Sequence, residues 1–184
     1  MFTELFLAGL SRPIAVIGNG RFHFRFGEVI DRYATVIRIN AFQIDGYEQW
    51  CGSRVTHWCT FGDTTVNPPL PRRRRNGLRP LSPFTSIAPE STNIKPHFRG
   101  RMIFAARCRL RHLFPRPSTG FALLLLLQEL GYQVDVFGFD GFTSGHYYDP
   151  GHRHDANHTP YELEYLRLVP AFRLFARSPR SLGR

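Results

Sequence analysis

One helix–strand unit in the second half of the chain limits the fold more than any other feature. Pro117–Gly120 (PSTG) opens a predicted helix over Phe121–Leu130, with a hydroxyl side chain available as N-cap, and Gly131 ends it. Gln133–Phe139 (QVDVFGF) follows at once as a predicted strand. A helix that leads directly into a buried strand is typical of α/β proteins.

The first part of the chain shows the same alternation. Ile14–Gly18 (IAVIG) and Thr35–Asn40 (TVIRIN) are short, β-branched runs typical of strands. Gly27–Tyr33 between them is compatible with one or two helical turns, and further strands are predicted over Val55–Phe61 and Arg101–Ala106. These elements predict a three-layer α/β domain with a largely parallel sheet.

The remaining segments complete a single predicted domain, residues 1–184. Pro160–Phe172 (PYELEYLRLVPAF) predicts a last helix, whose first-turn glutamates suit the helix dipole. Residues 66–96 are rich in proline, arginine and serine and lack periodicity, which predicts a long surface loop inserted in the domain. A chain of 184 residues suits one compact domain with its own core.

Arginine dominates the net charge of +10, because only Lys95 among the 24 lysines and arginines is a lysine. A preference for GC-rich codons explains this ratio more simply than a binding role, although guanidinium groups pair well with phosphate and carboxylate. Arg72–Arg75 keeps a basic nucleic-acid-binding module open as an alternative. No helix-turn-helix, zinc or RNA-binding signature accompanies it, so no nucleic-acid partner is predicted.

The sequence predicts a cytoplasmic location. No stretch approaches the roughly 20 apolar residues of a membrane helix. Met1–Leu10 carries Glu4 and lacks the basic start of a secretory signal. The three cysteines fit no zinc spacing and are expected to be free thiols in a reducing compartment. An arginine-rich surface could still contact an anionic membrane, such as a bacterial inner membrane, at its periphery.

Gly18–Gly20 (GNG), directly after the first strand, suggests a nucleotide-binding turn. The dinucleotide fingerprint would need a glycine where His23 stands and an acidic residue where Asn40 ends the next strand. A nicotinamide or flavin site is therefore not predicted. A loop that brings the Asn19 amide and open backbone to a nucleotide remains a good interpretation.

The start of the predicted helix offers a second candidate site. Ser118, Thr119 and Gly120 place two hydroxyl groups and a small residue where unpaired N–H groups and the helix dipole attract anions. The alternative is an ordinary N-cap without any ligand.

Four histidines gather within 13 residues after the strand that ends at Phe139: His146, His152, His154 and His158. Histidine suits proton transfer near neutral pH, so this cluster is the candidate for acid–base chemistry. A metal site is the alternative. The order of the last three histidines and Asp155 matches neither the His-x-His-x-Asp-His pattern of metallo-hydrolases nor a helical His-Glu-x-x-His pair. No metal is therefore predicted.

In this order, the motifs resemble those of the sialyltransferases, glycosyltransferase family 29. The large sialyl motif is similar to Ile14–Asn40 with Gly52–His57 (GSRVTH), and the small motif to Pro117–Phe139. The third motif is similar to His146–Asp149 (HYYD), and the very small motif to His158 with Glu162 or Glu164. The four motifs cover about half of the chain. Family 42 shares the Gly-Asn-Gly turn, but the HYYD and Gly-Ser-Arg segments favour family 29.

The resemblance implies an enzyme with a Rossmann-like fold, a variant of the GT-A type. It would transfer sialic acid, or a related acidic sugar, from a CMP-sugar donor to a glycan hydroxyl, with inversion and without a metal or other cofactor. His158 would be the general base and His146 would stabilise the departing phosphate. The nucleotide would be held by Asn19, Asn40, Ser118, Thr119, Gly120, Gly138 and Tyr147.

Some assignments stay open within that resemblance. Animal members join the large and small motifs by a disulfide, and the matching positions here are Ile14 and Gly131, which fits a cytoplasmic, bacterial version. The spacing after His158 leaves Glu162 and Glu164 as alternative partners, and His154 is an alternative base. An inactive relative that only binds a nucleotide is a further alternative.

Overall fold

The computed structural model describes residues 10–40, 42–59, 79–80, 117–153 and 161–175. Within them, six strands form one sheet in the order β4-β3-β2-β1-β5-β6, and every neighbouring pair is parallel. The strands are β1 (Ile14–Ile17), β2 (Thr35–Ile39), β3 (His57–Cys59), β4 (Arg79–Pro80), β5 (Val134–Phe137) and β6 (Phe172–Phe175). The predicted α/β class and largely parallel sheet are confirmed.

The strand β1 lies between two neighbours that come from distant parts of the chain. Ile14 is level with Thr35 of β2 on one side and with Val134 of β5 on the other. The sheet therefore grows in opposite directions from the β1–β5 junction. In open parallel sheets, ligands bind at such a junction, beyond the carboxyl ends of the strands.

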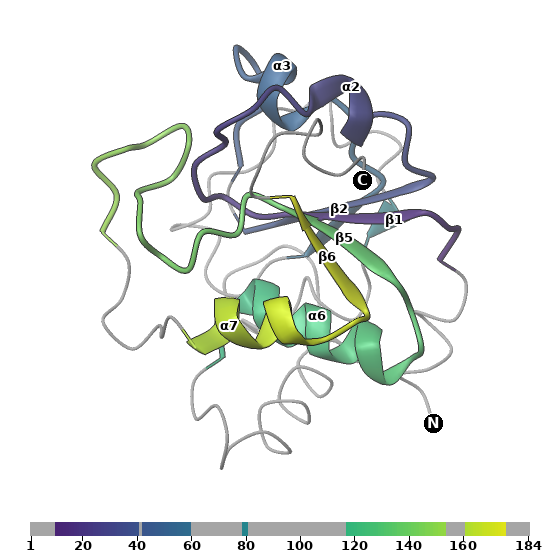
Figure 1. Ribbon diagram of the computed structural model, residues 1–184. Coiled ribbons are helices and arrows are strands. Elements are labelled where there is room, and N and C mark those ends of the chain that lie inside the picture. The colour runs from purple at the N-terminus through teal and green to yellow at the C-terminus, as the bar shows by residue number, and fades with distance from the viewer. Residues whose placement is uncertain (1–9, 41, 60–78, 81–116, 154–160, 176–184) are drawn as a thin grey trace, which may run out of the picture.

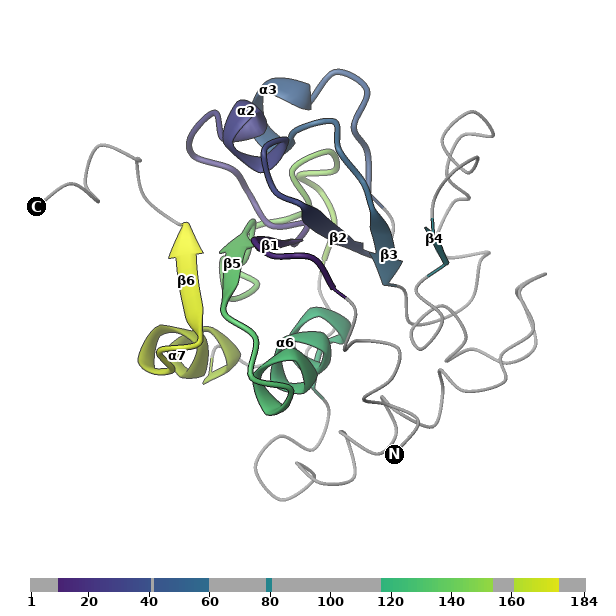
Figure 2. The ribbon, with the colours of Figure 1, turned by 90° about the vertical axis from the view of Figure 1, so that its right-hand side faces the viewer.

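Helices cover both faces of the sheet (Figures 1 and 2). The short helices α2 (Gly27–Ile30) and α3 (Glu48–Cys51) lie on one face, and α6 (Thr119–Glu129) and α7 (Tyr161–Leu168) lie on the other. This arrangement gives the three layers that the sequence predicts. No helix among these described segments is long and apolar enough to cross a membrane.

Each face of the sheet has its own hydrophobic core. Under α6, the buried residues come from the helix itself and from alternate sheet positions such as Val16, Ile37 and Val136. On the other face, Ala15, Ile17 and Phe137 pack with aromatic residues around α2. Because successive residues of a strand point to opposite faces, strands buried on both sides are apolar throughout, as IAVI is.

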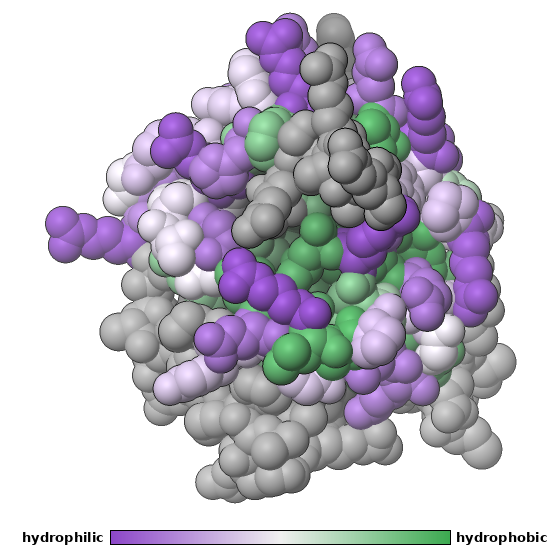
Figure 3. Space-filling model, in the orientation of Figure 1, coloured by the Kyte–Doolittle hydropathy of each residue, from purple (hydrophilic) through white to green (hydrophobic). Residues whose placement is uncertain are grey.

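The outer surface in Figure 3 is mostly hydrophilic where residues are described, with a smaller hydrophobic area near its centre. Two large apolar side chains of α7 are well exposed, Tyr161 at 65% and Leu168 at 81%. This pattern agrees with a helix that buries only Glu162 and Leu166.

The structure confirms the helix at residues 119–129 and its two ends. The Ser118 hydroxyl accepts a hydrogen bond from the N–H of Phe121 at 3.2 Å, as an N-cap does. Gly131 follows the helix with φ +73°, a left-handed conformation that glycine adopts without a Cβ clash.

The prediction of one helix over Pro160–Phe172 is wrong at its end. The helix stops at Leu168, and Phe172–Phe175 instead forms β6, which pairs with β5. Pro170 explains the break, because proline lacks an N–H and its ring clashes with the preceding turn. Further differences are smaller: α2 ends at Ile30, and β3 begins at His57 rather than at Val55.

Other predictions lie partly or wholly outside the described residues. The strand predicted over Arg101–Ala106 and the tail Ala176–Arg184 fall outside them. Of the loop predicted over residues 66–96, only Arg79–Pro80 is described, and it pairs with β3 as β4.

Candidate functional site

Two glycines let the carboxyl ends of β1 and β5 touch. The N–H of Gly18 donates to the carbonyl of Phe137 at 2.7 Å, and the N–H of Gly20 donates to the carbonyl of Gly138 at 2.9 Å. A Cβ on Gly18 would lie 2.4 Å from the Gly138 oxygen, and one on Gly138 would lie 2.7 Å from the Gly18 oxygen. Both distances are too short for a real carbon, so the close contact requires glycine at both positions.

The two predicted asparagines lie at neighbouring strand ends. Asn19, only 8% exposed, donates from Nδ2 to the carbonyl of Ile39 at 3.2 Å and so links the ends of β1 and β2. Asn40 has φ +51°, and its N–H donates to the carbonyl of Cys59 at 2.7 Å. Asparagine tolerates this left-handed backbone better than most residues.

The start of α6 reaches the same edge of the sheet. A Cβ on Gly120 would meet the Phe139 ring at 2.7 Å and the Ile39 side chain at 2.8 Å. Glycine therefore lets the first turn of the helix approach the ends of β2 and β5. The first N–H groups of a helix lack intrahelical partners, and here the helix start that carries them packs against the ends of β2 and β5.

Ser118 is held by a buried carboxylate on α7. The Glu162 side chain accepts from the Ser118 N–H at 2.8 Å and from the Ser118 hydroxyl at 2.6 Å. Burial raises the pKa of Glu162 above its ordinary value, and the hydrogen bonds from Ser118 offset part of the rise. Glu164 is exposed. Of the two glutamates left open by the sequence, Glu162 is the one that contacts the small motif.

The loop after β5 crosses the edge of the sheet and reaches the opposite layer. Asp140 organises its first turn by accepting from the N–H of Phe142 at 3.0 Å and of Ser144 at 3.2 Å. Further on, the Tyr147 N–H donates to the Asn19 carbonyl at 2.9 Å. The Tyr147 hydroxyl donates to the Gln43 carbonyl and accepts from its N–H at 3.1 Å.

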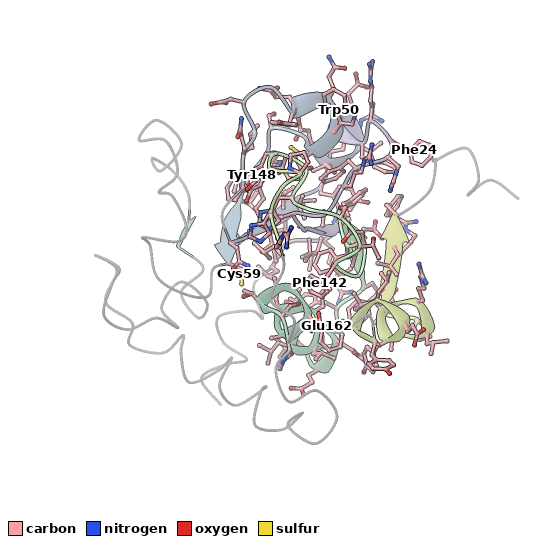
Figure 4. The ribbon with its side chains drawn as sticks, turned by 90° about the vertical axis from the view of Figure 1, so that its left-hand side faces the viewer. Phe24, Trp50, Cys59, Phe142, Tyr148 and Glu162 are labelled. Carbon is pink, nitrogen blue, oxygen red and sulfur yellow. The ribbon has the colours of Figure 1, made fainter. Side chains whose placement is uncertain are left out.

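Aromatic side chains fill the space around this loop. Tyr147 meets Phe22 and Tyr47 edge to face, with ring centroids 5.3 and 5.2 Å apart. Burial raises the pKa of Tyr147, so its hydroxyl stays protonated and can donate at all physiological pH values. Figure 4 shows Tyr148 and Phe142 of this loop between Trp50, near the α2–α3 layer, and Glu162, near α6.

His146 precedes Tyr147 and is half-buried. Its ring stacks on that of His152, with centroids 3.7 Å apart and planes 13° from parallel. The other two histidines of the cluster, His154 and His158, lie outside the described residues. Among the residues that are described, no group of three or more His, Cys, Asp or Glu side chains could hold a metal ion.

Comparisons with known proteins agree with this geometry. Residues 11–87, which include the large motif, match the model of glycosyltransferase family 29 (sialyltransferase). The resemblance to family 29 is confirmed. Among proteins with curated functions, none matches the chain in sequence.

Solved structures extend the likeness to the fold of this sialyltransferase-like chain. A mammalian sialyltransferase, and one in complex with Gal-beta-1-3GalNAc-ortho-nitrophenol, both align with a TM-score of 0.61. Their identities are 17% and 18%, and each alignment covers 96% of this chain and 79% of the other. The shared fold confirms the predicted Rossmann-like, GT-A-like architecture.

Within the sialyltransferase-like chain, the structure gathers most of the predicted site. Asn19, Asn40, Ser118–Gly120, Gly138 and Tyr147 all lie at the carboxyl edge of the sheet, tied together by the contacts above. His146 lies near the same edge because the next residue, Tyr147, is hydrogen-bonded to the Asn19 carbonyl. The prediction for His158 stays a prediction, because this residue is not described.

Sequence reasoning missed the role of Arg38, which is fully buried within β2. Its guanidinium donates to the carbonyls of Cys51 at 2.7 Å, Gly52 at 2.8 Å and Arg54 at 3.2 Å. It therefore fixes the Gly-Ser-Arg segment of the large motif. A charged residue in the middle of an apolar strand was the available signal, because a buried charge needs partners.

Asp31 holds the same segment from outside. Its carboxylate accepts from the Ser53 N–H at 2.8 Å, the Ser53 hydroxyl at 2.8 Å and the Arg54 N–H at 2.7 Å. Burial opposes ionisation of Asp31, but the hydrogen bonds outweigh it and lower the pKa of Asp31 below its ordinary value. The Gly-Ser-Arg segment is thus held by contacts within the domain.

Proposed function

We propose that this chain transfers sialic acid, or a related acidic sugar, from a CMP-linked donor to a hydroxyl group of a glycan. The observation that carries the proposal is the link from Tyr147 through Asn19 to the end of β2. It joins the third sialyltransferase-like motif to the large one at one strand edge, and the contacts of Gly138 with Gly20 and of Gly120 with Ile39 bring the small motif to the same edge. The position is the one where parallel α/β sheets bind nucleotides.

The proposed nucleotide site supplies neutral donors and one imidazole. The N–H groups at the start of α6 and the helix dipole favour the phosphate of CMP. The asparagine amides of Asn19 and Asn40 can bind the nucleotide. His146 would donate to the phosphate as it leaves, which stabilises the charge that develops there.

The proposed reaction is a single displacement at the anomeric carbon. His158 takes the proton from the acceptor hydroxyl, the oxygen forms the new glycosidic bond, and the bond to the CMP phosphate breaks with its electron pair. Attack from the face opposite CMP inverts the configuration. A CMP phosphate is already a good leaving group, so N–H donors and an imidazole suffice and the proposal requires no metal or other cofactor.

The proposal places the protein in the cytoplasm. Two of its cysteines, Cys51 and Cys59, are buried free thiols. Burial raises the pKa of the Cys59 thiol and so keeps it protonated and inert. The proposed location rests on the unpaired state of Cys51 and Cys59, because free cysteines are usual in a reducing compartment.

The test is release of CMP from two donors, CMP-sialic acid and CMP-Kdo, followed by acceptor screening with the preferred donor. We expect CMP release to increase when a suitable glycan is added, and the product to have the inverted configuration by NMR. CMP binding without any release from either donor would instead support the inactive relative. Absence of both binding and release would reject the proposal.

A further inference from the structure

A cavity of about 200 Å³ lies beside the proposed nucleotide site, at the carboxyl ends of β5 and β6. Its walls come from the loop after β1, the turn after β5, and α7. Gly138 is the predicted nucleotide residue that also lines this cavity. The cavity therefore adjoins the site described above but is built mainly from other side chains.

Two arginines face the cavity from different elements. Arg21 follows β1, and Arg167 lies in the last turn of α7. Both residues are exposed, and neither guanidinium has a hydrogen-bond or ion-pair partner among the described residues. The His23 imidazole lies on the same wall as Arg21. These donors are available to a ligand with a negative charge.

The cavity also contains one carboxylate, Asp140, which is already engaged. It accepts from the N–H groups of Phe142 at 3.0 Å, Ser144 at 3.2 Å and Arg21 at 3.5 Å, and from the Ser144 hydroxyl. No ion pair joins it to either arginine within the described part of the chain. Asp140 can still accept from a ligand hydroxyl, because a carboxylate has about four acceptor positions.

Apolar side chains complete the walls. Phe22, Phe139, Leu163 and Phe175 line the cavity between the polar groups. Ligand sites commonly combine such an apolar surface with a few polar groups that fix orientation. The volume is below the roughly 300–1,000 Å³ of sites for drug-sized ligands, so it suits one ring rather than an oligosaccharide.

We propose that this cavity binds one acidic sugar ring of the acceptor glycan. The inference rests on the proposed function and names the class of acceptor. The carboxylate of the ring pairs with Arg21 and Arg167, the ring packs on the phenylalanines, and a ring hydroxyl donates to Asp140. An acidic sugar is selected over a neutral one because only the acidic sugar neutralises the two guanidinium groups.

The test is calorimetric binding of two acidic probes, trigalacturonic acid and sialyllactose, with galactotriose and lactose as their neutral counterparts. CMP is kept saturating, so that the nucleotide site is filled. We compare the unchanged protein with Arg21→Gln, Arg167→Gln and the control Arg32→Gln. Arg32 is exposed on another part of the surface, and each substitution removes one positive charge.

We expect at least one acidic probe to bind at least tenfold more tightly than its neutral counterpart. Arg21→Gln and Arg167→Gln should each weaken it about tenfold or more, because each removes a charge-assisted hydrogen bond, whereas Arg32→Gln should change it less than twofold. Equal weakening in all three variants, or no binding of either acidic probe, would overturn the inference.

Two further measurements distinguish recognition of the sugar ring from binding of a bare anion or of the nucleotide. Inorganic phosphate should compete only weakly; competition as strong as that of the sugar would show a simple anion site and reject recognition of the ring. CMP binding, measured alone, should be unchanged in both cavity variants. Loss of CMP binding would move these arginines to the nucleotide site and reject the acceptor role. The proposed function itself fails if the unchanged protein releases no CMP from either donor.

Discussion

Glu162 and Ser118, 44 residues apart in the chain, are joined by two hydrogen bonds to one carboxylate. The pair ties α7 to the N-cap of α6, and α6 begins at the proposed phosphate site. The contact gives the buried Glu162 a structural reason to stand where it does. The position of the first turn of α6 therefore depends on the Glu162 side chain of α7.

Ser118→Ala should destabilise the protein. The substitution removes the cap of α6, worth about 1 kcal/mol, and leaves one oxygen of a buried carboxylate without its hydroxyl donor, which adds about 1–3 kcal/mol. The free energy of unfolding from urea titration should therefore fall by about 2–4 kcal/mol. Ser11→Ala, at an exposed serine, is the control and should stay within about 0.5 kcal/mol. Similar values for both variants would contradict this role.

Glu162→Gln should change how stability depends on pH. Because the folded protein raises the pKa of Glu162 above its ordinary 4.5, the folded state holds this proton more tightly than the unfolded state does. Stability from this group is thus fully present below pH 4.5 and is lost as pH rises through the folded value. In Glu162→Gln this part of the slope should disappear in urea titrations at several pH values. If stability instead fell more steeply with rising pH in Glu162→Gln than in the unchanged protein, the pKa of Glu162 would be lowered in the folded state.

Gly138→Ala should cost far more stability than Gly131→Ala. Both glycines have left-handed backbones, φ +65° and φ +73°, so each alanine pays about 1–2 kcal/mol for conformation. A Cβ at Gly131 meets nothing within 4 Å, whereas one at Gly138 lies 2.7 Å from the Gly18 oxygen. We expect an extra loss of about 1–3 kcal/mol for Gly138→Ala by thermal unfolding. Equal losses of stability in the two variants would mean that the backbone between β1 and β5 can move apart to accommodate the added Cβ.

Arg38→Met should be among the most damaging single substitutions in the sheet. It leaves the carbonyls of Cys51, Gly52 and Arg54 without their buried donor, at about 1–3 kcal/mol each where water cannot enter. We expect a loss of at least about 3 kcal/mol in urea titration. Arg32→Met, on the surface, should have little effect. A mild effect of Arg38→Met would show that water replaces the guanidinium.

His158→Ala should abolish transfer and leave CMP binding nearly unchanged, because a base acts on the acceptor rather than on the nucleotide. His154→Ala is the matched comparison, since His154 is the alternative base. Transfer is followed by product formation and CMP binding by calorimetry, and both assays are repeated in EDTA, where full activity is expected. Loss of activity in EDTA that a divalent ion restores would show a metal site instead.

The sequence predicted the parts of the fold that depend on local signals. The helix start at Ser118, the glycine at position 131 and the apolar runs of β1, β2 and β5 carry their own composition and spacing. β6 was missed because Phe172 continues a helical pattern and only pairing with β5 makes it a strand. At Phe172–Phe175, pairing with a neighbouring strand outweighs the local secondary-structure propensity.

The site was predicted unevenly for the same reason. The Gly-Asn-Gly turn and the Ser-Thr-Gly helix start stand out in sequence, and both reach the sheet edge. The buried contacts of Arg38 and Glu162 depend on residues 13 to 44 positions away. Sequence spacing alone does not fix such contacts, so it could not choose between Glu162 and Glu164.

The place of β5 beside β1 has a consequence for how the protein can be made. The segment that matches the family model, residues 11–87, includes β1 and β2 but neither β5 nor α6. Until the ribosome has added α6, this helix cannot cover Val16, Ile37 and Ile39. The segment of the chain that matches the family model therefore lacks part of its own core, and fragments that end before α6 should aggregate unless a chaperone covers the exposed apolar face of the sheet.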